Sequence, residues 1–434
     1  MYKKKRTTAI LGAGAVLDFS FPKDIMFPST SNITKEVCKP YVKHDLLDDN
    51  MIPQQIYDHL LANYPKDVNP WVSEAENKPY IHFEMIFHVM ESYLAYERAW
   101  SGRCKNSAIY PVFGPFTGAT RLYDVRKLHS IMDEYIMRIM RIIEQYDSYY
   151  RCNPPAEQWY HDFFAKSPLR WDVFNFNYDT TIEHSLQDYV DGFVDIPGET
   201  FKKFDPKSLW YHDSNLSTIN HLHGCIHYFY ERYKDRAQES TAYKLHDLYK
   251  YDSTEKVLDM MHGTGMSLPH DQSGEEYYAG PIITGLKKND KLNCIPYDFY
   301  HGCLYNSIMA SPSLFIAGYS FGDFYANNLI DRFDAIHGSQ KRVVVIDKWN
   351  EKKMAEFGID KYLEYSVSHN EIAFMLRMAG LSDVHELIRD LNMPKHTRPK
   401  RMLRSSNGCL MIGVSGFKAA SVHSAEIYNF LNKR

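Results

Sequence analysis

The chain has 434 residues, 44% of them hydrophobic, so it is long enough to bury a sizeable core in one large domain or two ordinary ones. Its 50 basic and 54 acidic residues give a formal net charge of -4, which excludes attraction of the whole chain to nucleic acid or to an anionic membrane. The seven cysteines are scattered and form no CxxC pair, as is typical of a reduced protein. No segment reaches the roughly 20 apolar residues of a membrane span. We therefore expect a cytoplasmic protein.

Apolar runs rich in β-forming residues predict the strands. The first run covers residues 8–11. The basic residues before it resemble the start of a signal peptide, but Gly12, Gly14 and Asp18 interrupt the apolar stretch and no small-residue cleavage site follows, so we interpret it as a strand. Such runs suit parallel strands buried on both faces. Further strands are expected at residues 171–176, 218–222, 314–317 and 342–346.

Helical spacing dominates the segment between the first two long strands. Its clearest helix covers residues 123–146, where apolar residues recur at helical intervals and charged residues take the other side. Residues 228–280 form a polar, tyrosine-rich insertion. Beyond residue 354 the sequence predicts two helices, a basic linker, a strand and a final helix, at residues 371–378, 384–391, 395–404, 409–414 and 425–431.

Strands that alternate with helices predict a doubly wound, Rossmann-like α/β fold with a parallel sheet and a large helical insertion. We expect residues 1–20 and 166–350 to form the sheet domain, residues 21–165 a helical module, and residues 351–434 a C-terminal extension. Ligands of such sheets bind at the carboxyl ends of the strands. The informative side chains should therefore follow the strands directly.

The first motif is Gly12-Ala13-Gly14, directly after the first strand. Glycines there let the backbone approach a pyrophosphate, and a following helix would offer free N–H groups. Leu17 stands where the dinucleotide fingerprint has its third glycine, so a plain strand-to-helix turn is an equal alternative.

The second and third motifs end the next two strands. Asn175, Asn177 and Asp179 lie at the end of one strand. The alternative for them is a purely structural role in a turn or a helix cap. His221-Leu222-His223-Gly224 ends the other, where a structural histidine is the alternative. The spacing of His221, His223 and His227 suggests a metal site, but no carboxylate or thiolate completes it in the sequence, so no metal is expected.

The fourth motif is Gly318-Tyr-Ser320-Phe-Gly322-Asp323, which matches G-x-S-x-G, the nucleophile elbow of α/β hydrolases. Asp347 ends the following strand, and two histidines lie beyond it. A serine hydrolase with Ser320 as its nucleophile is therefore an alternative function, and its general base would be His369 or His385.

The four motifs in this order resemble the sirtuin superfamily. Tyr178 and the form of the fourth motif are similar to the sirtuin-like NAD hydrolases of bacterial antiphage defence. The resemblance covers residues 8–20 and 170–350. It implies catalysis in which Asn177 holds water or the nicotinamide ribose, Asp179 orients it and His223 is the general base. It also implies NAD contacts, to phosphate, ribose or the nicotinamide side, from Gly12, Ala13, Gly14, Asp18, Gly318, Ser320 and Asp347.

One departure concerns zinc. Deacetylating sirtuins carry a four-cysteine zinc module, but Cys225 is the only cysteine between Cys152 and Cys294. The resemblance therefore implies cleavage of the nicotinamide–ribose bond of NAD, without a metal, rather than deacetylation. A nucleotide-binding scaffold without chemistry is the remaining alternative.

The same resemblance implies control by assembly. We expect a homo-oligomer, with a HerA-type ATPase or another operon-encoded defence protein as partner. The four motifs are complete before Met354. We therefore expect the basic linker at residues 395–404 and the strand and helix after it to form an assembly element outside the sheet.

Overall fold

The computed structural model describes residues 4–39, 52–63, 81–101, 125–153, 157–230, 247–263, 278, 280–284, 291–292 and 294–433. The remaining parts of the predicted helical module and of the predicted insertion at residues 228–280 lie outside the described residues. None of the described helices is long and apolar enough to cross a membrane.

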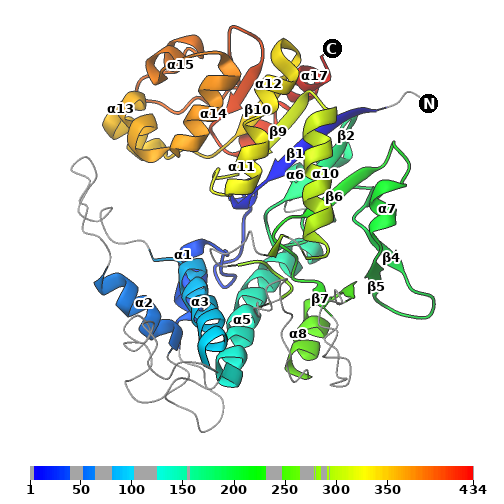
Figure 1. The fold of residues 1–434 in the computed structure, drawn as a ribbon. Coiled ribbons are helices and arrows are strands. Elements are labelled where there is room, and N and C mark those ends of the chain that lie inside the picture. The colour runs from blue at the N-terminus through cyan, green and yellow to red at the C-terminus, as the bar shows by residue number, and fades with distance from the viewer. Residues whose placement is uncertain are drawn as a thin grey trace.

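An eight-stranded sheet organises one half of the molecule (Figure 1). Its order is β11-β12-β10-β9-β1-β2-β6-β3, and all neighbours are parallel except β11 and β12. The strands are β1 (Lys5–Leu11), β2 (Leu169–Asn175), β3 (Tyr189–Val190), β6 (Ser217–His221), β9 (Ser313–Ala317), β10 (Arg342–Ile346), β11 (Leu403–Arg404) and β12 (Leu410–Gly413). The predicted α/β fold and its five strands are confirmed.

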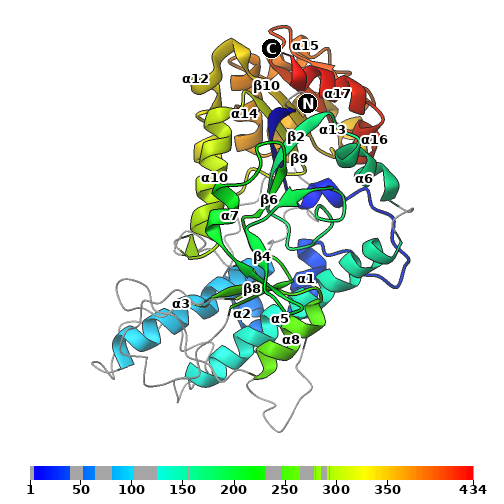
Figure 2. The ribbon, with the colours of Figure 1, turned by 90° about the vertical axis from the view of Figure 1, so that its right-hand side faces the viewer.

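Helices cover both faces of this sheet, as a doubly wound fold requires. Figure 2 shows α10 on one side of the sheet and α6, α16 and α17 on the other. Every residue of β2, β6 and β9 is buried, and in β2 and β6 this includes polar side chains such as Asp172 and Asn220. The helices around the sheet are α6 (Gln158–Ala165), α7 (Pro206–Trp210), α10 (Tyr297–Ala310), α11 (Phe324–Ile330), α12 (Phe333–His337), α13 (Glu351–Ser366), α14 (His369–Ala379), α15 (Val384–Asp390), α16 (Phe417–Ser421) and α17 (Ser424–Asn432).

The strand order reverses at β1, because the chain builds outward from β1 through β2 and β6 on one side and through β9, β10 and β12 on the other. Such a switch point is where ligands of open α/β sheets bind, in the crevice beyond the carboxyl ends of the strands. The loops that follow β1 and β9 meet there.

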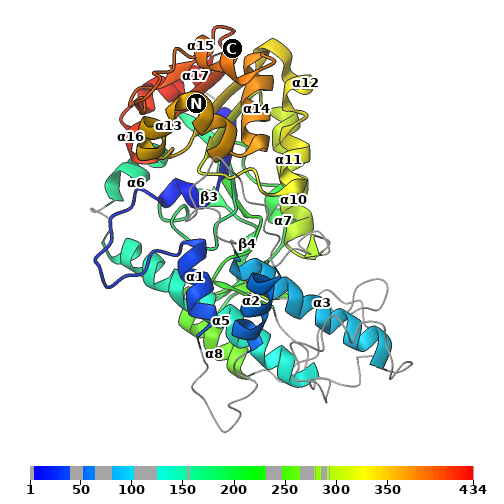
Figure 3. The same cartoon turned by 90° about the vertical axis from the view of Figure 1, so that its left-hand side faces the viewer.

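Helices from several segments form a second body beside the carboxyl ends of the strands (Figure 3). Helix α5 is its centre, and α1, α3 and α8 pack against it. The sequence predicts a helix at residues 123–146, whereas α5 runs to Cys152 because its apolar face continues to pack. These helices are α1 (Thr30–Val37), α2 (Ile52–Ala62), α3 (Phe83–Ser101), α5 (Val125–Cys152) and α8 (Thr254–Gly263).

A small antiparallel sheet, in the order β4-β5-β8-β7, lies beside these helices. Its strands were not predicted from the sequence, because each is only three residues long. They are β4 (Phe193–Asp195), β5 (Lys202–Phe204), β7 (Tyr228–Tyr230) and β8 (Leu248–Lys250).

The C-terminal section belongs to the large sheet. The expectation that the strand and helix after Lys395 lie outside it is wrong, because β12 pairs in parallel with β10 and α17 packs on β9 and β10. All four residues of β12 are buried, so the strand completes the core. The linker is also held in place, since Arg398 donates to the carbonyl oxygen of Trp349 at 2.8 Å. The domain boundaries themselves stay predictions.

Candidate active site

Two glycine loops cross at the switch point of the sheet. Gly14 of the loop after β1 donates its amide N–H to the carbonyl oxygen of Gly318 in the loop after β9, at 2.9 Å. Gly318 has a φ of +59°, and a Cβ on it would lie 1.9 Å from the amide nitrogen of Ala15. Only glycine fits at this crossing. Close packing therefore already requires glycine here, and it brings both loops to the edge where a ligand is expected.

The turn after β1 is a short 3-10 turn, η1 (Ala13–Val16). The expectation of a helix N-terminus directly behind the glycines is wrong, because the turn ends after four residues. The amide of Gly12 donates to the carbonyl oxygen of Ala317 at the end of β9 at 3.0 Å, and the amide of Gly14 donates to that of Gly318 in the following loop at 2.9 Å. Of the three residues Gly12, Ala13 and Gly14, the exposed Ala13 is the one whose amide donates no hydrogen bond to Ala317 or Gly318 among the described residues.

Asn177 joins the end of β2 to the same turn. Its side-chain Nδ2 donates to the carbonyl oxygen of Gly12 at 3.2 Å, and its backbone N–H donates to Oδ1 of Asn175 at 3.1 Å. The side chain is almost fully buried. The first and second predicted motifs therefore meet at one edge of the sheet.

His223, which follows β6, pairs with a carboxylate from the fourth motif. Its Nε2 lies 3.0 Å from Oδ2 of Asp323, and its ring packs edge-on against Phe176. The other oxygen of Asp323 accepts the backbone N–H of Ala326 and caps the start of α11. Burial lowers the pKa of the neighbouring His301 to about 4. Asp323 is thus held by a helix end while it faces the imidazole of His223.

Asp179 lies in the turn after β2 but bonds within that turn. Its Oδ1 accepts the backbone N–H of Thr181 at 3.1 Å and also the Thr181 hydroxyl. Burial raises the pKa of Asp179. Burial and the charge of Asp179 raise the pKa of Asp147, on α5, to about 7. The backbone N–H and hydroxyl of Thr180 both donate to Asp147 at 2.7 Å, so this turn is tied to α5.

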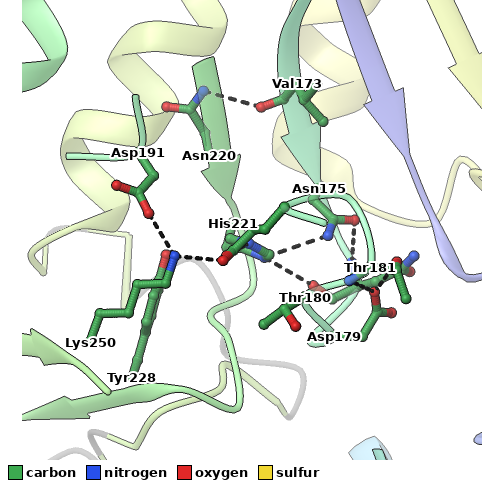
Figure 4. Close-up of polar contacts among 12 residues, drawn as sticks. Val173, Asn175, Asp179, Thr180, Thr181, Asp191, Asn220, His221, Tyr228 and Lys250 are labelled. Atoms are coloured by element: carbon green, nitrogen blue, oxygen red, sulfur yellow. Dashed lines mark hydrogen bonds and ion pairs between the residues drawn. The ribbon is translucent and has the colours of Figure 1, made fainter. Parts of the chain in front are cut away.

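A buried charge network supports the ends of β2 and β6 from the side of the small sheet (Figure 4). Lys250 Nζ lies 2.7 Å from Glu183 and 2.6 Å from Asp191, and His221 Nε2 lies 2.9 Å from Glu183. Burial alone would lower the pKa of Lys250, but Asp191 and Glu183 raise it well above its ordinary value. His221 Nδ1 lies 3.4 Å from the carbonyl oxygen of Asn177. The network therefore fixes the backbone that carries Asn177.

The three histidines at the end of β6 and in the turn after it contact three different sets of acidic residues. His221 faces Glu183, His223 faces Asp323, and His227 lies near Glu144 and Asp147 of α5. They do not share one metal site, because each faces a different set of acidic residues.

Ser320 is exposed in the loop after β9. Within the described part of the chain, no hydrogen bond joins it to His369 or His385, and His385 instead lies 3.5 Å from Asp360. The positive φ angles of this loop fall on Gly318 and Phe321 rather than on the serine. A nucleophile elbow strains the serine itself. These contacts give no support to the serine hydrolase alternative.

Asp347, at the end of β10, lies beside a second acid. Its amide N–H donates to the carbonyl oxygen of Gly413 at 2.9 Å, which ties it to β12. Burial raises the pKa of its carboxyl. Glu371 of α14 is 5% exposed, and burial together with Asp347 raises the pKa of Glu371. The half-buried carboxyl of Asp347 and the buried carboxyl of Glu371 therefore lie near each other beyond the end of β10.

Asp18 bonds to the C-terminal section. Its Oδ1 lies 2.8 Å from Nζ of Lys348, and its Oδ2 accepts the backbone N–H of Lys418 at 2.9 Å, at the start of α16. A Cβ on Gly416 would lie 2.3 Å from this carboxylate. The contacts of Asp18 join the loop after β1 to α16, and none of those described reaches Asn177 or His223.

Sequence reasoning did not single out Asp323, Lys250 or Glu371. Asp323 had a signal, because it ends the fourth motif and stands where a helix N-cap is expected. Lys250 and Glu371 lie in the predicted insertion and in a predicted helix, and only the tertiary fold brings them to the site.

Comparison with family models matches residues 172–366 to the SIR2-like domain. No curated protein matches the chain. The matched range runs from β2 to the end of α13 and contains Asn177, His223, Ser320 and Asp347, but not β1 or β12. SIR2-like domains bind NAD. The parallel sheet, its switch point and the SIR2-like match over residues 172–366 together fit NAD-dependent activity in general.

Proposed function

We propose that the chain is an NAD glycohydrolase, which cleaves the nicotinamide–ribose bond and releases nicotinamide and ADP-ribose. The observation that carries this proposal is the His223–Asp323 pair, which lies at the carboxyl edge of a SIR2-like sheet. A histidine held by a carboxylate at one ring nitrogen presents a defined tautomer at the other, as a general base requires.

The proposed reaction is attack of water on C1′ of the nicotinamide ribose. The bond between C1′ and the nicotinamide nitrogen breaks, and its electron pair leaves with nicotinamide. The imidazole of His223, oriented by Asp323, takes the proton that the water loses. We assign to Asn177 the positioning of the water or the ribose, because it stands between β2 and the Gly12 turn.

The remaining site residues follow the same edge. We propose that Gly12, Ala13 and Gly14 lie against the phosphates, Gly318 and Ser320 against phosphate or ribose, and Asp347 against the adenosine ribose. Asp179 is proposed as a positioning residue, since its contacts hold the turn rather than reach the sheet edge. The bonds of Asp18 to Lys348 and Lys418 favour a structural role for it over contact with nicotinamide.

An enzyme that drains NAD must be held inactive until it is needed. We therefore propose a role in abortive-infection antiphage defence, with activation by homo-oligomer formation or by an operon-encoded partner such as a HerA-type ATPase. Nicotinamide release by the purified chain, alone and with the products of neighbouring genes, tests this. Nicotinamide release by the wild type in at least one of these states supports the proposal. NAD binding without release in every state would favour the scaffold alternative.

A further inference from the structure

A second polar cluster lies outside the proposed NAD site, where α5 meets the turn between β6 and β7. One ring nitrogen of His227 and one carboxylate oxygen each of Glu144 and Asp147 lie within 4.8 Å of one another. Glu144 and Asp147 are three residues apart on α5, so they share one face of the helix. We propose that Glu144, Asp147 and His227 bind one divalent transition-metal ion, with ligands that suit Zn²⁺.

The imidazole of His227 gives the first evidence for a ligand. The residue is 5% exposed, and its Nε2 is buried without a hydrogen-bond partner among the described residues. One of its ring nitrogens lies within 4.8 Å of a carboxylate oxygen of Glu144 and of one of Asp147, so the ring can offer a lone pair to an ion held between them. A neutral imidazole is the most common nitrogen ligand of metals in proteins. A buried ring nitrogen without a partner calls for a ligand that supplies one.

The charge around the cluster points to a cation. Glu144 and Asp147 share one permanently charged basic partner, Arg151, so the two carboxylates together carry more negative charge than their ion pairs offset. A divalent cation would offset that excess.

The existing bonds of the two acids leave room for a metal ion. Arg151 lies 2.5 Å from Oε1 of Glu144 and 3.2 Å from Oδ2 of Asp147. Thr254 donates to Oε2 of Glu144 at 2.6 Å, and Thr180 donates to both oxygens of Asp147. An ionised carboxylate offers about four lone-pair positions. Donors of this kind also hold and orient metal ligands in known sites.

A neighbouring group of potential metal ligands has its charges and hydrogen bonds provided for by other side chains. The ligand atoms of Glu183, His221 and Cys225 also lie within 4.8 Å of one another. There, however, Lys250 lies 2.7 Å from Glu183, and Nε2 of His221 is used by Glu183 at 2.9 Å. That group is compensated without a metal ion, and it supplies a matched control.

The proposed site would couple the helical body to the active-site loop. Asp147 accepts two hydrogen bonds from Thr180, which adjoins Asp179. An ion held by Asp147 and His227 would lock α5 to the turns that follow β2 and β6. No metal was expected from the sequence, because the four-cysteine module is missing and no carboxylate or thiolate near His221, His223 and His227 in the sequence completes a site. A three-ligand site built from two distant segments leaves no such signature.

Metal analysis of the full chain without an affinity tag tests the proposal. The protein is stripped with EDTA, dialysed against Zn²⁺ or, separately, Mn²⁺, freed of unbound metal and analysed by mass spectrometry and thermal melting. We expect about one equivalent of retained Zn²⁺ and a raised melting temperature. His227→Gln and the milder Glu144→Gln, on a partly exposed side chain, should each weaken Zn²⁺ binding by at least about 10-fold. Both should keep the wild-type circular dichroism spectrum.

Cys225→Ala is the control, because it removes a ligand only from the compensated group. It should retain Zn²⁺ as the wild type does, and the Co²⁺-loaded wild type should show no thiolate charge-transfer band. Three results would overturn the proposal: folded wild type that retains no metal, equal retention by the wild type and both ligand variants, or loss of metal in Cys225→Ala alone. None of these readouts depends on NAD hydrolysis.

Discussion

His223 and Asp323 stand 100 positions apart in the chain, yet Nε2 of the histidine lies 3.0 Å from Oδ2 of the aspartate. The two residues reach each other because β6 and β9 end at the same edge of the sheet. Asp323 is also the N-cap of α11, so its carboxylate is fixed before any ligand arrives. A base oriented in this way needs little rearrangement to act.

Replacing Asp323 by asparagine should reduce NAD turnover without removing the fold. Asparagine caps a helix as well as aspartate does, but it no longer stabilises the imidazolium or fixes the tautomer of His223. We expect kcat to fall by roughly 10²- to 10⁴-fold with little change in KM. Asp331→Asn, at the exposed end of the same helix, is the control and should keep full activity. An Asp323→Asn enzyme with normal kcat would remove the pair from the mechanism.

Ser320 distinguishes an NAD contact from a hydrolase nucleophile. As an NAD contact, Ser320→Ala should raise KM and leave kcat within about 10-fold of the wild type. The exposed hydroxyl should also resist a fluorophosphonate probe, because no histidine among the described residues is bonded to it. Mass spectrometry of the treated protein measures the labelling. Stoichiometric modification of Ser320 would instead support a serine hydrolase.

Gly318→Ala should strongly destabilise the protein. The new Cβ would lie 1.9 Å from the amide nitrogen of Ala15, so the loops after β1 and β9 would have to separate. The control is Gly408→Ala, at a φ of +69° with no atom within 4 Å, which adds only the backbone cost of about 1 kcal/mol. We expect urea denaturation to give Gly318→Ala a loss at least about 2 kcal/mol larger. Equal losses would show that the crossing is loosely packed.

Glu371 should make stability fall as the pH rises. Burial and the charge of Asp347 raise the pKa of Glu371 from 4.5 to about 8. Its contribution is therefore fully present below the unfolded pKa of 4.5 and is lost as the pH rises through 8. Glu371→Gln should gain stability over the wild type at pH 8.5, by no more than roughly 5 kcal/mol, and much less at pH 5.

Urea denaturation of both proteins at the two pH values measures this difference. Glu356→Gln, on an exposed position of α13, serves as the control and should differ from the wild type by the same small amount at each pH. A Glu371→Gln variant that is less stable than the wild type at pH 8.5 would contradict the assignment.

Strands β9 and β10 could be predicted from the sequence because both consist mainly of apolar residues, whereas polar residues interrupt the apolar ones in β2 and β6. For β10 the predicted and observed bounds agree, and for β2 they differ by two residues at one end and one at the other. The position of β12 was missed for a different reason. Its apolar run was recognised, but it was placed outside the sheet because the four motifs end before it. The residues around Leu410 carry no signal that this strand pairs with Val343.

The candidate site was predictable where a residue follows a strand. Gly12, Asn177 and Gly318 come together as expected for the carboxyl edge of a parallel sheet. The buried charged residues that support this edge of the sheet were not predictable. Lys250 and Glu371 act through contacts between segments that are far apart in sequence, and no spacing rule carries that information.

The amounts of nicotinamide and ADP-ribose formed from NAD, measured by chromatography for the wild type and His223→Ala in the same assembled state, test the central claim most directly. The account predicts that the wild type forms the two products in equal amounts, and that His223→Ala still binds NAD but forms them at least about 100-fold more slowly. Equal product formation by the two proteins, or NAD binding without any product from the wild type in every assembled state, would contradict it.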